Sequence, residues 1–147
     1  MYKFAISVII AAVFLISCVN ITDQKTEPAS LKTPFFKTTW ELVELDNKTI
    51  VQKAPVKTPF IRFSEKENKV NGHTGCNGFF GTVELSLDTI KFGPVGMTRM
   101  ACQQWAETET LFLSMINKAS HYDIRGDMLF FLDEKQVVVV FKASGKK

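Results

Sequence analysis

Three cysteines, Cys18, Cys76 and Cys102, are the residues in this chain best suited to chemistry. Two cysteines can form a disulfide, stay as buried thiols, or serve a metal or redox site. A metal site would use His73-x-x-Cys76 together with Cys102 and His121. Only the first two of these residues have ligand-like spacing, and the chain has no CxxC motif. We therefore predict that the protein binds no metal and no other cofactor.

Asn77 directly follows Cys76, and Thr98 lies four residues before Cys102. Asn77 could bind a ligand, but asparagine more often stabilises its own turn, which favours a structural role. Thr98 and Arg99 could form an anion site with the N–H groups of nearby glycines. No Gly-Lys-Ser/Thr follows those glycines, so the segment is not a phosphate-binding loop.

The side chains that serve nucleophilic or acid–base catalysis have no suitable partners in this sequence. The serines lack a nucleophile-elbow motif, and neither His73 nor His121 has an identifiable acidic partner. Glu107 and Glu109 lie two residues apart in a predicted helix, and so on different faces. We predict that the protein is not an enzyme. A thiol- or metal-dependent enzyme that uses Cys76, Cys102 and His73 remains an alternative.

Glycine recurs every third residue at Gly72, Gly75, Gly78 and Gly81. Glycine adopts positive φ readily and lets another backbone come close, and a run of glycines weakens regular helices and strands. We predict a shaped loop over residues 72–81 that lies against the segment around Cys102.

The first 17 residues have the pattern of a bacterial export signal, with Lys3 before an apolar stretch too short to cross a bilayer. Leu15-Ile16-Ser17-Cys18 resembles the bacterial lipobox, whose cysteine is acylated and becomes the mature N-terminus. We predict a lipid anchor on Cys18. An ordinary signal peptide and an uncleaved anchor are the alternatives. Val19 stands where Asp would signal inner-membrane retention, which favours the outer membrane, facing the periplasm.

Export also bears on the other two cysteines. With Cys18 lipidated, Cys76 and Cys102 remain as a pair in an oxidising compartment. This favours a disulfide between them over two buried thiols or a metal or redox site.

Length and composition limit the class of protein. A chain of 147 residues fits one domain, and a hydrophobic share of 46% is enough for a core. The net charge of +3, without basic runs among aromatic residues, gives no support for nucleic-acid binding. Thirteen phenylalanines against two tyrosines predict a core filled with aromatic side chains.

The order of elements predicts a mainly β (α+β) fold. We expect a tether over residues 18–37, one domain over 38–143 and a polar tail over 144–147. Apolar alternation predicts about eight strands, and residues 93–96 are expected to end one of them. A 3.6-residue period predicts one helix over residues 102–119. Short strands of this kind form a small antiparallel β-barrel, here capped by the helix and filled inside.

Four motifs in this sequence resemble the META/HslJ domain family. They are Gly72-x-x-Gly75-Cys76-Asn77-x-Phe79-x-Gly81, Thr98-x-x-Ala101-Cys102, Glu109-x-x-Phe112-Leu113 and Tyr122-x-Ile124-x-Gly126-Asp127-x-Leu129-x-Phe131. The resemblance covers about Thr38 to Ala143. It implies a lipocalin-like antiparallel β-barrel with one helix, and a cell-envelope role loosely linked to heat shock and antibiotic tolerance. It brings no catalytic residue or ligand. Val83 departs from the family pattern, which usually has tyrosine there.

We therefore expect a non-catalytic lipoprotein of the bacterial cell envelope that is anchored to the membrane by its lipid. Its partner would be an envelope protein, an envelope polymer or a small molecule, and not a nucleic acid. The alternative from another class is an inhibitor of an envelope-attacking enzyme such as lysozyme, by analogy of fold alone.

Overall fold

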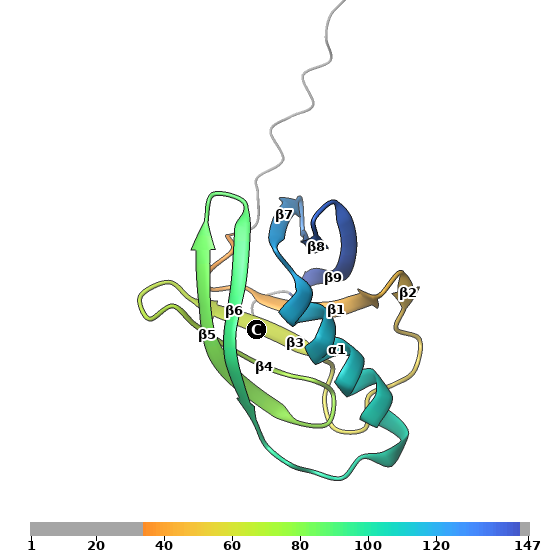
Figure 1. Ribbon diagram of the computed structural model, residues 1–147. Coiled ribbons are helices and arrows are strands. Elements are labelled where there is room, and N and C mark those ends of the chain that lie inside the picture. Colours follow the sequence, from red (N-terminus) through yellow and green to blue (C-terminus); the bar gives the residue numbers. More distant parts are fainter. Residues whose placement is uncertain (1–33, 145–147) are drawn as a thin grey trace, which may run out of the picture.

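A single antiparallel sheet and one α-helix make up the described part of the chain. The computed structural model describes residues 34–144 (Figure 1). In chain order the elements are β1 (Thr39–Leu45), β2 (Lys48–Thr49), β3 (Phe60–Ser64), β4 (Lys69–His73), β5 (Gly78–Ser86), β6 (Thr89–Met97), a 3₁₀ helix η1 (Gln103–Trp105), α1 (Ala106–Lys118), β7 (His121–Arg125), β8 (Met128–Asp133) and β9 (Gln136–Ser144).

The sheet closes into a ring because β1 pairs with β9 as well as with β3. Along the described residues, β6 and β7 share a single residue pair, Thr89 with His121. The helix α1 connects these two strands and packs against β6 on one side of the gap and β8, β9 and β1 on the other (Figure 1). The predicted mainly antiparallel fold with one helix is confirmed. Residues 34–144 form nine strands instead of about eight because the two-residue strand β2 pairs with β1.

The prediction of a loop over residues 72–81 is wrong, because most of this segment is the β4–β5 hairpin and only residues 74–77 are irregular. Gly72 shows why glycine here is compatible with a strand. A Cβ at Gly72 would lie 2.2 Å from the Phe60 carbonyl oxygen and 2.6 Å from the Phe79 ring. The glycine therefore lets the inward-facing Phe79 ring lie against the backbone of β4.

The predicted strand end at residues 93–96 is also wrong, since β6 continues to Met97 and pairs there with Phe79. Gly81 pairs with Val95 and Val83 with Phe92. Two residues of β6, Gly93 and Pro94, therefore stand opposite one residue of β5. Such a β-bulge is one of the few places where a sheet accommodates proline.

Aromatic side chains fill the interior of the ring, as the composition predicted. Phe131 contacts Phe141 edge to face at 5.2 Å between ring centroids, and Phe112 contacts both Phe141 and Phe79 in the same way. Trp40, Phe112, Phe131 and Phe141 are fully buried in this core. Edge-to-face pairs add about 0.5–1.5 kcal/mol each beyond the buried area.

The helix is shorter than predicted. Cys102 precedes η1, and α1 itself begins at Ala106 and ends at Lys118. Phe112, Met115 and Ile116 are its buried residues, so the predicted apolar stripe faces the core.

The folded domain extends beyond the boundaries predicted for it. Phe35, which we assigned to the tether, stacks on Phe63 at 4.3 Å and accepts a hydrogen bond at its carbonyl from Trp40 Nε1 at 3.0 Å. Ser144, assigned to the tail, is the last residue of β9. The predicted signal sequence, Cys18 and most of the predicted tether lie outside the described residues.

Candidate functional site

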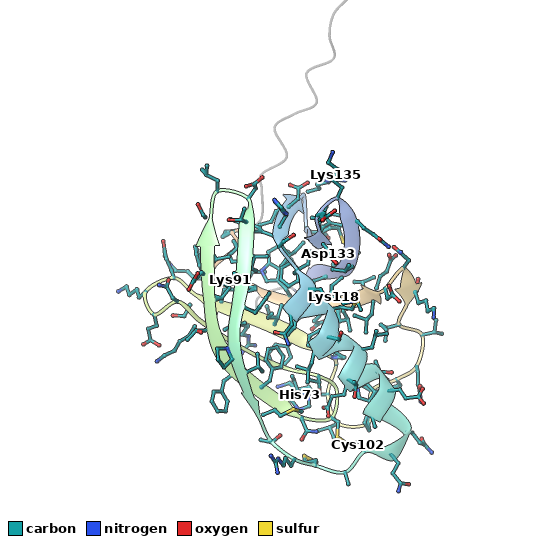
Figure 2. The ribbon with its side chains drawn as sticks, in the orientation of Figure 1. His73, Lys91, Cys102, Lys118, Asp133 and Lys135 are labelled. Carbon is teal, nitrogen blue, oxygen red and sulfur yellow. A yellow bond between two sulfur atoms is a disulfide. The ribbon has the colours of Figure 1, made fainter. Side chains whose placement is uncertain are left out.

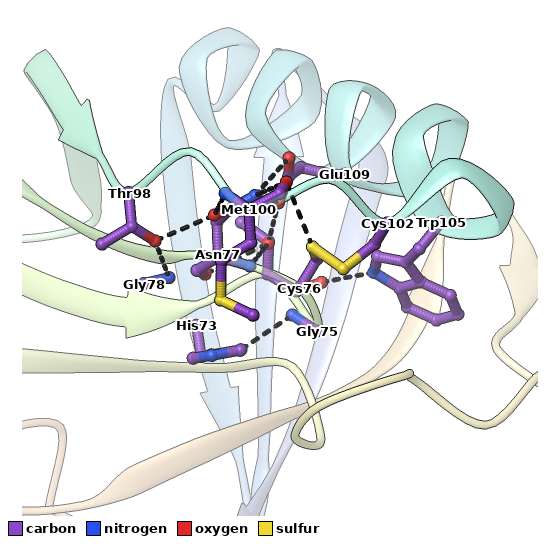
Figure 3. The surroundings of a disulfide bond; sticks show 11 residues. His73, Gly75, Cys76, Asn77, Gly78, Thr98, Met100, Cys102, Trp105 and Glu109 are labelled. Atoms are coloured by element: carbon purple, nitrogen blue, oxygen red, sulfur yellow. Dashed lines mark hydrogen bonds between the residues drawn. A yellow bond between two sulfur atoms is a disulfide. The ribbon is translucent and has the colours of Figure 1, made fainter.

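Cys76 and Cys102 form a disulfide that joins the β4–β5 hairpin to the segment before α1 (Figure 3). Their Cα atoms are 6.1 Å apart, although the residues are separated by 26 positions. The predicted disulfide is confirmed. The alternatives of two free thiols and of a metal bound by Cys76 and Cys102 do not fit, because each sulfur is bonded to the other.

Asn77, next to Cys76, is 2% exposed and uses both ends of its side-chain amide within the protein. Its Oδ1 accepts hydrogen bonds from Thr98 Oγ1 at 2.9 Å and from the Met100 backbone N–H at 2.7 Å. Its Nδ2 donates to both carboxylate oxygens of Glu109 at 3.0 Å. Asn77 therefore ties β5 to the segment after β6 and to α1, which is a structural role.

Thr74 and Glu109 complete this cluster through hydrogen bonds to Asn77. The Thr74 hydroxyl donates to Glu109 Oε2 and accepts from the Asn77 backbone N–H at 3.0 Å. The buried Trp105 indole donates from Nε1 to the Thr74 carbonyl at 2.7 Å. We call Thr74, Asn77, Thr98, Trp105 and Glu109, with the disulfide, the hairpin–helix cluster.

Sequence reasoning missed the bonds of Glu109 and Trp105 in the hairpin–helix cluster. The sequence places both residues only within the predicted helix over residues 102–119. The signal that could have found Glu109 is its place in the family motif. A motif gives positions along the chain but no partners, and the partners of Glu109 are Asn77 and Thr74, which lie 32 and 35 residues away between β4 and β5.

Gly75 is required by both its conformation and its surroundings. Its φ is +107°, and a Cβ there would lie 2.4 Å from Trp105 Nε1. We expect Gly75→Ala to lower the free energy of unfolding by roughly 2 kcal/mol or more, since it combines backbone strain with a clash in a packed site. Urea unfolding measures this loss. Gly78→Ala is the control, because its φ is not positive and a Cβ would meet only the Gly72 carbonyl oxygen at 3.9 Å.

The remaining predicted residues lie around this cluster. Phe79 is buried, Gly81 lies in β5, and Ala101 is exposed beside Cys102. The Thr98 hydroxyl accepts from the Gly78 backbone N–H at 3.1 Å in addition to its bond with Asn77. The Thr98 hydroxyl and the Gly78 N–H are therefore bonded within the protein. They are not turned toward an anion, as the site considered for Thr98 and Arg99 would need.

The family model of the META domain matches residues 31–146, which include every residue of the hairpin–helix cluster. The chain belongs to the META domain family. The match spans all of the residues that the structure describes. No curated protein matches the chain.

Three solved structures share the fold of this META domain. A protein from Burkholderia xenovorans, solved by NMR, has a TM-score of 0.61 at 19% identity and covers 76% of this chain and 85% of its own. A second NMR structure has a TM-score of 0.55 at 25% identity and covers 71% and 87%. The crystal structure of a DUF4847 family protein from Bacteroides vulgatus has a TM-score of 0.56 at 14% identity and covers 77% and 96%.

His73 is hydrogen-bonded to Gly75, which lies between Thr74 and Cys76 of the hairpin–helix cluster. Its Nδ1 accepts a hydrogen bond from the Gly75 backbone N–H at 3.1 Å, which only a neutral ring can do. Burial and then the nearby Lys57 charge lower the pKa of His73 below its ordinary 6.5, although Glu109 acts in the opposite direction.

This lowered pKa predicts how stability changes with pH. As the pH falls below about 6.5, the unfolded chain binds a proton at His73 more readily than the folded chain does. The stabilisation from neutral His73 is therefore full above that pH and is lost as the pH falls through the lower pKa of the folded state. Unfolding measured between about pH 5 and 7.5 should show a smaller loss of stability on acidification in His73→Gln than in the unmodified protein. An equal loss in both would contradict this role.

The polar groups of the META domain are satisfied within the fold. No buried side-chain nitrogen or oxygen among the described residues lacks a hydrogen-bond partner. Within residues 34–144 there is no group of three or more His, Cys, Asp or Glu side chains placed to hold a metal ion. The same part of the chain contains no helix with the length and apolar character needed to span a bilayer.

Proposed function

We propose that this META-domain protein is a non-catalytic binding module of the bacterial cell envelope, anchored by a lipid on Cys18. The observation that carries the proposal is the state of the hairpin–helix cluster. Its two cysteines are bonded to each other, and Asn77, Thr74 and Glu109 are hydrogen-bonded to one another. The side chains best suited to catalysis or ligand binding therefore hold segments of the fold together. We infer that the domain acts on a partner through its surface.

Two features support the proposed compartment. The lipobox-like Leu15-Ile16-Ser17-Cys18 favours lipidation, and Val19 favours the outer membrane, facing the periplasm. A disulfide persists in such an oxidising compartment. The proposed partner is a protein, a polymer or a small molecule of the envelope, and the proposed role is tolerance of stress or antibiotics.

Cell fractionation tests the anchor. We expect the unmodified protein in the membrane fraction, with radiolabel from palmitate, and Cys18→Ala in unprocessed form without label, since the lipid is attached to the cysteine sulfur. Cys102→Ala is the matched control, because it also removes a cysteine but leaves the lipobox intact. Palmitate label on Cys18→Ala would rule out Cys18 as the lipidated residue.

Complementation of a deletion strain under heat and antibiotic stress separates binding from catalysis. Glu109→Gln keeps the shape of the side chain and removes its charge, so it would disable an acid–base catalyst more than a binding surface. We expect the unmodified protein and Glu109→Gln to complement the deletion in proportion to the amount of folded protein in the envelope. A Glu109→Gln protein that is present at the normal level, unfolds at the normal denaturant concentration and fails to complement would overturn the non-catalytic proposal.

A further inference from the structure

Two surface segments meet at the end of the domain that carries the disulfide. Residues 50–59 connect β2 to β3, and residues 98–105 connect β6 to α1. Together they line a hollow of about 430 Å³, with Gln52, Lys53 and Pro55 on one side and residues 101–105 on the other. The Gly75 carbonyl accepts hydrogen bonds from the backbone N–H groups of Val56 and Lys57 at 3.1 and 3.3 Å, which fixes the first segment to the hairpin–helix cluster.

The charges of these two segments all have the same sign. Lys53, Lys57 and Arg99 are exposed, and neither segment contains Asp or Glu. In the first turn of α1, outside both segments, Glu107 is exposed, whereas Glu109 is bonded to Thr74 and Asn77. This end of the domain therefore presents three cations to solvent without a compensating acid in either segment.

Large apolar side chains are exposed in the same two segments. Five such side chains are strongly exposed among residues 34–144, and three of them lie in these segments: Val51 at 89%, Val56 at 52% and Met100 at 55%. The set Val51, Lys53, Val56, Lys57, Arg99 and Met100 is called the basic–apolar end below. A surface that combines exposed apolar groups with cations has the character of an interfacial membrane-binding surface.

We propose that the basic–apolar end binds the surface of a bilayer that contains anionic lipids. Each Lys or Arg near an anionic surface contributes about 1 kcal/mol, and apolar side chains that enter the boundary between headgroups and acyl chains add to this. A soluble anionic polymer would satisfy the three cations but would leave Val51, Val56 and Met100 in water. The exposed apolar groups are the reason to choose a lipid surface.

The position of the chain entry is compatible with this contact. Phe35 packs on Tyr122, whose hydroxyl donates to the Leu87 carbonyl in the turn between β5 and β6. Figure 1 shows this turn at the end of the domain away from the start of α1, and Figure 2 shows Cys102 and His73 at the end opposite Asp133 and Lys135. Fifteen residues separate Cys18 from Pro34 and span at most about 50 Å when extended, enough to pass along the domain. The inference adds a second membrane contact to the proposed anchor.

Vesicle sedimentation of the chain from Val19 onward tests the inference without the lipid, so that its failure does not bear on Cys18. This chain contains the complete closed ring and core. We expect binding to vesicles with phosphatidylglycerol, weaker binding at high salt, and little binding to pure phosphatidylcholine. The triple variant Lys53→Gln, Lys57→Gln, Arg99→Gln should lose roughly 100-fold in the partition coefficient. The matched triple variant Lys91→Gln, Lys118→Gln, Lys135→Gln removes three exposed lysines elsewhere and should change it by about 2-fold or less.

A second pair of variants tests the apolar part. Val56→Ser and Met100→Ser together should weaken vesicle binding at unchanged net charge. Three results would overturn the proposal: no dependence on phosphatidylglycerol, equal losses in the two triple variants, or binding to soluble polyglutamate that is as strong as binding to vesicles and insensitive to the two serine substitutions.

Discussion

Replacing both Cys76 and Cys102 with alanine should lower the free energy of unfolding by about 3.5 kcal/mol, because the bond closes a loop of 26 positions in the unfolded chain. The same bond holds the segment before α1 against the β4–β5 hairpin. We therefore expect the double variant to unfold in a single transition at a lower urea concentration, followed by the fluorescence of the buried Trp40 and Trp105.

Treatment of the unmodified protein with a reductant is the control for this experiment. It breaks the same bond without changing any side-chain volume, so the midpoint should move to that of the double variant. If reduction and substitution both leave the midpoint unchanged, the two sulfurs are not bonded in the folded protein.

Asn77→Ala should cost about 3 kcal/mol, because it removes the buried Asn77 amide that accepts from the Met100 backbone N–H and donates to the Glu109 carboxylate. Glu109→Ala should cost about 2 kcal/mol, since Thr74 also loses its acceptor. The two residues bond each other directly, so the double variant should be about 1–2 kcal/mol more stable than the sum of the single changes predicts.

The exposed Glu107 provides the control for this double-mutant cycle. It lies on the same helix two residues away, and Glu107→Ala should change stability by about 0.5 kcal/mol or less and show no coupling to Asn77→Ala. Strict additivity of Asn77→Ala and Glu109→Ala would contradict the cluster as described.

The sequence predicted the features that depend on composition and local period. Alternating apolar residues located most strands, and the 3.6-residue stripe placed Phe112, Met115 and Ile116 on the buried face of the helix. The pairing of Cys76 with Cys102 followed from the cysteine count and the export signal, with no need of geometry.

The features that depend on contacts between distant segments could not be predicted in the same way. The run of glycines indicated a loop because glycine is unfavourable in an isolated strand. In the folded protein Gly72 gives the Phe79 ring room against the backbone of β4, which outweighs that preference. The partners of Asn77 and Glu109 depend on how β5, the segment after β6 and α1 meet, and no local pattern specifies this.

The single residue pair between β6 and β7 gives the hairpin–helix cluster its structural importance. A complete hydrogen-bond ladder between β6 and β7 would hold these two strands together without the helix. With one residue pair between them, α1 fills the gap between β6 and β7. The disulfide and the bonds of Asn77 and Glu109 fix the start of α1 to β5. This arrangement uses the polar residues of the family motif to hold the helix in place.

Peptide mapping by mass spectrometry under non-reducing conditions, on protein extracted from the membranes of the producing cells, tests the central claim most directly. The account predicts one linked pair of peptides, containing Cys76 and Cys102, and an N-terminal peptide that begins with an acylated Cys18. Recovery of Cys76 and Cys102 as separate alkylated peptides from protein alkylated before extraction would contradict it.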